Sequence, residues 1–129
     1  MAYEAPVFSI PGLVAGADLS DYQYYLVKLN STAQQVVRCD AVTDIPIGIL
    51  QNDPESGEAA EVMALGVSKL KLGTTITKSQ LIGTDTSGAA AVKATTTTSE
   101  MVVGQCIEGG AAGEYGTVTV NCLGACRAV

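Results

Sequence analysis

The amino-acid sequence predicts a mainly β protein: one small barrel-like or sandwich-like body with an internal two-fold repeat and an extended N-terminal arm. Short runs rich in Val, Ile, Thr and Tyr alternate with turns rich in Gly, Pro, Asn and Asp, which is typical of strands joined by tight turns. No long helix is expected, although residues 77–80 have the spacing of a single helical turn. The length of 129 residues fits one domain.

Residues 1–20 are expected to form the arm. Pro and Gly separate isolated apolar residues there, and no period of two or 3.6 residues is sustained. These apolar residues need a surface to lie on, which is either another protein or an edge of the chain's own sheet.

The β-rich domain is expected over residues 21–129. Leu70 alternates with Lys69 and Lys71 as in a strand, but Met63 lies on the opposite parity, so a bulge is expected near Gly66. The main strands are expected at about residues 22–29, 35–39, 45–50, 60–72, 101–107 and 117–122.

The two halves of the chain match each other when the sequence is shifted by 56 residues without gaps. Gly48 then meets Gly104, and Val62 meets Val118. Because the identities fall on turns and strand centres, we predict two copies of a strand, turn, strand, turn, strand unit. The alternative is a chance match between Gly-rich turns. The predicted half-repeats are residues 26–72 and 82–128.

The charge pattern argues against nucleic-acid binding. The formal net charge is −6, and the seven basic residues are scattered along the sequence instead of being concentrated for phosphate contacts. No apolar run near 18 residues predicts a membrane span, and no signal segment opens the chain. Synthesis in a cytoplasm is therefore expected, with the cysteines as thiols.

We expect no catalytic, cofactor or metal site. The chain has no His, the commonest general base and metal ligand, and its four cysteines lack paired C-x-x-C spacing. The Gly-rich residues 109–113 lack the Lys of a phosphate loop and are expected to form a hairpin loop. Cys122 shares the inward parity of Val118 and Val120. Four carboxylates around a Pro/Gly turn are expected to be solvated: Asp53, Glu55, Glu58 and Glu61.

Three stretches carry a resemblance to a known family. The first is ADLSDYQYYLVK at residues 17–28, with IGILQN at 47–52 and GEAA at 57–60. The second is IT at 76–77, LI at 81–82, Asp85 and GAA at 88–90. The third is VG at 103–104, Gly113 and the β-run to Gly124, ending in RAV at 127–129. In their order and spacing, these stretches resemble the capsid cement, or head decoration, proteins of tailed bacteriophages.

The resemblance implies a non-enzymatic virion protein that is made in the host cytoplasm and binds the outer surface of the capsid. It implies a homotrimer that braces the major capsid protein, without a cofactor. Tyr3, Phe8 and Ile10 are then candidate anchors of the arm on the shell. Cys126 is a candidate for a disulfide with a neighbouring copy. The tyrosines that we expect at the trimer or shell contact, or alternatively in cross-strand packing, are Tyr22, Tyr24 and Tyr25.

Two other classes of function remain open at this stage. One is a surface-exposed carbohydrate-binding or adhesin-like β-domain, although such modules usually present aromatic platforms and this chain has no Trp. The other is a different virion component, such as a tail or head-completion protein.

Overall fold

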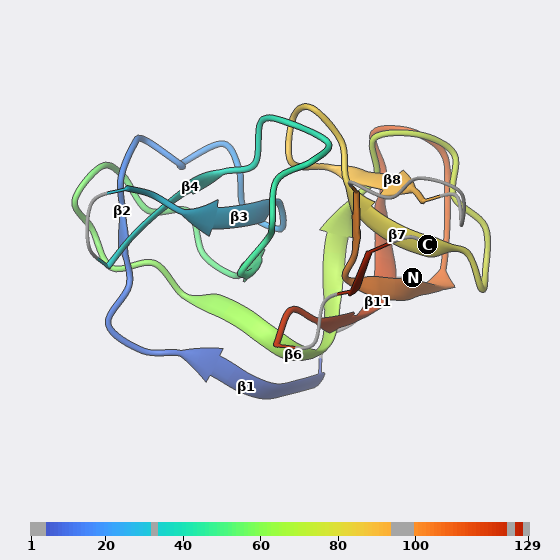
Figure 1. Ribbon diagram of the computed structural model, residues 1–129, viewed down its shortest axis with the longest axis horizontal. Helices are drawn as coiled ribbons and strands as arrows, with labels where there is room; N and C mark the ends of the chain where they lie inside the picture. Colours follow the sequence, from blue (N-terminus) through green and yellow to red (C-terminus); the bar gives the residue numbers. More distant parts are fainter. Residues whose placement is uncertain (1–4, 32–33, 94–99, 124–125, 128–129) are drawn as a thin grey trace.

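The computed structural model describes residues 5–31, 34–93, 100–123 and 126–127. These residues form an all-β structure without a helix, which consists of one mixed sheet of ten strands and a separate pair of short strands (Figure 1). Within the described residues, no helix is present that could cross a membrane. The strands are β1 Ala5–Ile10, β2 Val14–Ala15, β3 Leu26–Leu29, β4 Gln35–Arg38, β5 Gly48–Leu50, β6 Val62–Lys71, β7 Leu81–Thr84, β8 Ala90–Val92, β9 Met101–Val102, β10 Gly104–Glu108, β11 Tyr115–Asn121 and β12 Cys126–Arg127.

The long strand β6 connects the two halves of the sheet. The strand order is β2-β4-β3-β5-β6-β11-β10-β7-β8, and β1 also pairs with β6. Most neighbours are antiparallel, whereas β2 and β4 are parallel. In Figure 1, β2, β3 and β4 lie on one side of β6, and β7, β8 and β11 lie on the other.

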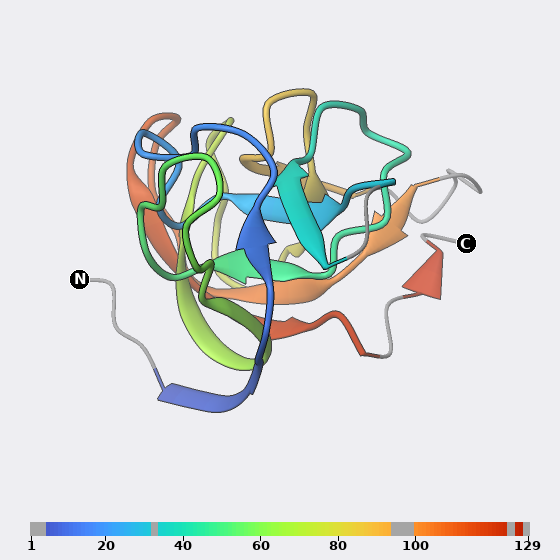
Figure 2. The same cartoon turned by 90° about the vertical axis from the view of Figure 1, so that its left-hand side faces the viewer.

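The N-terminal strands lie along the chain's own sheet. Strand β1 is antiparallel to β6, from Ala5 opposite Val67 to Ile10 opposite Val62, and its register shifts on both sides of Phe8. Figures 1 and 2 show β1 next to β6 at the rim of the body. This is one of the two placements that the sequence left open, and a role of the arm in binding another protein stays a prediction.

The change of parity in β6 arises at Gly66 without the expected bulge. Strand β6 pairs with β11 from Leu65 to Lys71 without a register shift, and the irregularities fall on the β1 side instead. Gly66 has a φ of 144°, a backbone conformation that favours glycine. The strand therefore changes direction at this residue, and no extra residue is inserted opposite β11.

Two of the expected turns are present, and neither is helical. At residues 77–80 the Thr77 amide donates to Gln80 Oε1 over 2.8 Å, but the segment is a turn and no helix follows. Residues 109–113 connect β10 to β11 as a hairpin loop, in which Gly113 has a φ of 89°.

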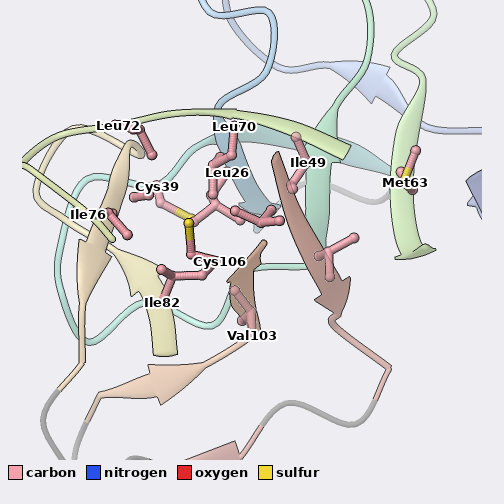
Figure 3. Packing of buried hydrophobic residues seen from close by; sticks show 13 residues of the cluster. Leu26, Cys39, Ile49, Met63, Leu70, Leu72, Ile76, Ile82, Val103 and Cys106 are labelled. Atoms are coloured by element: carbon pink, nitrogen blue, oxygen red, sulfur yellow. The ribbon is translucent and has the colours of Figure 1, made fainter. Parts of the chain in front are cut away.

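The interior consists of two clusters of aliphatic and small residues. The larger one is shown in Figure 3, where Leu26, Ile49, Leu70, Ile82 and Cys106 converge from five segments. It also contains Cys39, Met63, Leu72, Ile76, Ala90, Val103, Val118 and Val120. The smaller cluster contains Leu13, Ala15, Leu19, Val27, Val36, Leu50, Ala60 and Val62.

Candidate interaction surface

The described residues hold no group of three or more His, Cys, Asp or Glu side chains placed for a metal ion. Cys39 and Cys106 are buried, and Cys122 packs against the larger core cluster. Burial raises the pKa of Cys39 and of Cys122 to about 12, so both thiols are neutral and unreactive near pH 7. The side chain of Cys126 lies outside the described residues. The four carboxylates of the turn at 53–61 are all exposed.

The predicted arm anchors differ in their surroundings. Tyr3 lies outside the described residues. Phe8 is 44% exposed and lies opposite Leu65 of β6. Ile10 is half-buried, packs against the smaller core cluster and lines a shallow hollow of about 430 Å³ that also includes Leu13 and Ala60. Of the described anchors, Phe8 is the one that offers an apolar side chain to a partner.

The three predicted tyrosines of the contact lie together with a fourth one. Tyr22 and Tyr25 are in edge contact, with ring centroids 5.2 Å apart, and Tyr24 makes a similar contact with Tyr115 of β11 at 5.8 Å. Burial raises the pKa of Tyr25, and Tyr115 and Tyr22 add to the effect. The rings of each pair are nearly perpendicular, at 85° and 81°, so neither pair presents one flat aromatic face.

Three basic side chains converge on these rings. The Arg38 guanidinium lies 4.3 Å from the centroid of Tyr22, Lys69 Nζ lies 5.3 Å from that of Tyr24, and Lys71 Nζ lies 4.9 Å from that of Tyr115. The sequence showed these cations as scattered, because β4, β6 and β11 bring them together only in the fold. The i, i+2 spacing of Lys69 and Lys71 was the one available signal that they share a face. We call this surface the tyrosine–cation patch: Tyr22, Tyr24, Tyr25, Tyr115, Arg38, Lys69 and Lys71.

Backbone hydrogen bonds fix the central tyrosine of the patch. The Tyr24 amide donates to Leu50 O over 2.7 Å, and the Lys71 amide donates to Tyr24 O over 2.9 Å. Tyr24 has a φ of 67°, which is uncommon for a bulky residue. Next to it, Gln23 Nε2 donates to Gln51 O over 2.9 Å. The ring of Tyr24 is thus anchored to both β5 and β6.

A second surface feature is an apolar hollow of about 520 Å³ between the end of β3 and the segment before β5. Leu29 and Ile45 on its wall are 54% and 66% exposed. Lys28 lines the hollow and bonds Asp40 and Asp44 over 2.8 and 3.0 Å. Exposed apolar side chains of this kind mark contact surfaces when they lie together. The sequence analysis did not identify this hollow.

Comparison with known proteins gives one informative likeness. No protein-family model and no curated protein matches the sequence. Among solved structures, the fold is similar to the N base of the head fiber gp8.5 of bacteriophage phi29, with a TM-score of 0.68 and 18% sequence identity. The match covers 89% of this chain and 92% of that one. At this identity the likeness establishes a shared fold.

Proposed function

We propose that the protein is a non-enzymatic structural component of a tailed-phage head, which binds the outer surface of the capsid and reinforces it. The observation that carries the proposal is the fold, since a similar fold forms the base of a phage head fiber. The sequence resemblance to head decoration proteins supports the same assignment independently. The main partner is then the major capsid protein, and the place of action is the outside of the virion.

The surface of the molecule supports a role in binding protein. The tyrosine–cation patch is rich in the residue types that dominate protein interfaces, and the exposed Phe8, Leu29 and Ile45 offer apolar contacts. We further propose that the protein acts as a homotrimer. Closed cyclic symmetry would place several modest contacts on the shell at once, and linked contacts bind more strongly together than singly.

We propose that the body consists of two copies of one unit, at about residues 13–64 and 70–121. Ile49 pairs with Met63, and Gln105 pairs with Thr119 in the same way 56 residues later (49 to 105, 63 to 119). The offset is 55 between β3 and β7 and 54 between β4 and β8, as judged from Val27 opposite Arg38 and Ile82 opposite Val92. A gap-free shift of 56 therefore aligns β5 and β6 with β10 and β11 but misaligns the earlier strands.

Two further correspondences support the duplication. A Cβ at Gly48 would lie 2.4 Å from Met63 O, and one at Gly104 would lie 1.8 Å from Thr119 O, so each copy needs glycine at the same crossing. Each copy also closes on itself: Val14 bridges to Ala59 in the first, and Leu72 bridges to Ala90 in the second. We therefore propose that the sheet forms two small barrels that share β6.

The capsid-binding proposal is tested by co-sedimentation. The purified protein is mixed with expanded heads that lack it, from the phage that encodes it, and the pellet is assayed for bound protein and for heat resistance. We expect saturable binding and a higher temperature of DNA release. A protein that stays in the supernatant would refute the proposed function. A variant that begins at residue 17 tests the arm: undiminished binding by a folded variant would refute only the anchor role of Phe8 and Ile10.

A further inference from the structure

The first copy of the unit carries tyrosines where the second copy carries small or polar residues in the same backbone arrangement. The Tyr24 amide donates to Leu50 O, and the Ser79 amide donates to Cys106 O, over 2.7 and 2.8 Å. Tyr24 and Ser79 also share a positive φ, of 67° and 78°.

The neighbouring hydrogen bonds repeat as well. Leu50 and Cys106 donate to the carbonyls of Tyr25 and Gln80, each over 2.9 Å. Tyr25 and Gln80 themselves donate to the carbonyls three residues earlier, over 3.1 and 3.3 Å. The backbone of this segment therefore forms without aromatic side chains, as the second copy does. The rings of Tyr24 and Tyr25 are not needed for the fold, and their role lies at the surface.

The basic residues of the patch lack acidic partners. Within the described part of the chain, no carboxylate lies at ion-pair distance from Arg38, Lys69 or Lys71. By contrast, Lys28 and Lys93 both form ion pairs. The chain has 13 acidic residues against seven basic ones, so acidic side chains are plentiful. Three cations held together on rings, without a carboxylate, form a site that is complementary to negative charge.

We propose that the tyrosine–cation patch is the docking face of the protein and that its partner is a carboxylate-bearing surface of another protein, which we take to be the shell. The choice of the shell rests on the proposed function, whereas the carboxylate chemistry rests on the patch alone. Arg38, Lys69 and Lys71 pair with Asp or Glu of the partner. The hydroxyls of Tyr24 and Tyr115 bond the same carboxylates, while their rings exclude water from the contact.

The test compares matched variants on two probes. One probe is expanded heads that lack the protein, and the other is immobilised poly-L-glutamate, which a chain of net charge −6 can bind only through a local basic surface. The charge variant is Lys69→Gln/Lys71→Gln, with Lys78→Gln as an exposed basic control outside the patch. The ring variant is Tyr24→Ser/Tyr25→Gln, which copies the second unit.

We expect both patch variants to bind heads and poly-L-glutamate about tenfold more weakly or worse, and Lys78→Gln to change binding less than about twofold. Raising NaCl from about 50 to about 500 mM should weaken the wild type more than the charge variant. Unchanged unfolding midpoints exclude misfolding as the cause.

The outcomes separate the two proposals. If the wild type binds heads and both patch variants bind equally well, the docking face is refuted and the proposed function stands. If the wild type does not bind heads, the proposed function fails, and patch-dependent binding to poly-L-glutamate still decides the carboxylate chemistry. Loss of poly-L-glutamate binding in Lys78→Gln to the same extent would overturn the docking face, because the effect would then follow net charge.

Discussion

The ion pair between Lys93 and Glu100 allows a quantitative test of what holds the second unit together. Lys93 follows β8 and Glu100 precedes β9, and the Lys93 side chain is only 2% exposed. Its stem also packs across Gly83, where an added Cβ would lie 2.7 Å from Lys93 Cε. Removal of Glu100 by Glu100→Ala would leave a buried ammonium without its counter-charge.

The cost of that removal can be worked from the burial of the two partners. Breaking a fully buried ion pair costs about 3–5 kcal/mol, because one charge remains uncompensated. The Glu100 side chain is 23% exposed, so water reaches the site, and we expect Glu100→Ala to cost about 2–3 kcal/mol. Adding Lys93→Met removes the orphaned charge and keeps the stem. The double variant should therefore lie within about 1 kcal/mol of the wild type.

The assay is guanidinium unfolding at pH 7 for the two single variants and the double variant, evaluated as a double-mutant cycle. Asp40→Ala is the matched control, since Asp40 pairs with Lys28 but its side chain is 68% exposed. That control should cost less than about 0.5 kcal/mol. A double variant as unstable as Glu100→Ala alone would refute the reasoning, because the loss would then come from packing and not from the orphaned charge.

The remaining predictions concern one glycine and two thiols. Gly104→Ala should destabilise the protein by at least about 3 kcal/mol in denaturant unfolding, because the Cβ would overlap Thr119 O, whereas Gly57→Ala, where nothing lies within 4 Å, should lose only about 1–2 kcal/mol for its φ of 85°; equal losses would contradict the close-contact argument. The pKa of Cys39 and of Cys122 is raised by burial from 9.0 to about 12, so above pH 9 the unfolded chain loses these protons first and the free energy of unfolding falls as pH rises, by about 1.4 kcal/mol per pH unit for each thiol. Unfolding curves between pH 8 and about 11 should therefore be less steep in pH for Cys122→Ala than for the wild type, and an unchanged slope would show that the thiol titrates normally in the folded protein.

The sequence predicted the strands well because their signals are local. The alternation in 117–122 and the Gly-rich turn before it specify a hairpin strand without reference to distant residues. The placement of β1 on β6 could not be decided, since an isolated apolar residue such as Phe8 suits an intramolecular edge and a foreign surface equally well. Nor does any local pattern mark Lys93 as buried, because its burial depends on Gly83 and Glu100 of other segments.

The candidate site was predicted in part for the same reason. Tyr22, Tyr24 and Tyr25 were identified because they are adjacent in sequence and of an interface-prone type. Arg38 and Tyr115 were not, because β4 and β11 bring them to the tyrosines from positions that are far apart in the chain. Sequence reasoning finds residues that gather in one segment, whereas a surface assembled from four segments needs the pairing of the strands.

The two copies of the unit provide an internal control that separates the requirements of the fold from those of the surface. Where the copies agree, as at Gly48 and Gly104, a backbone contact demands the residue; where they differ under identical hydrogen bonding, as at Tyr24 and Ser79, the fold accepts either side chain. Ser79→Tyr tests this directly, because Ser79 is exposed and has a φ of 78°. We expect it to fold with a stability within about 1 kcal/mol of the wild type and to leave binding to heads unchanged, since among the described residues no cation in ring contact surrounds it. A large loss of stability in denaturant unfolding would mean that the first copy supports its tyrosine with packing that the second lacks, and Tyr24 would then belong to the fold.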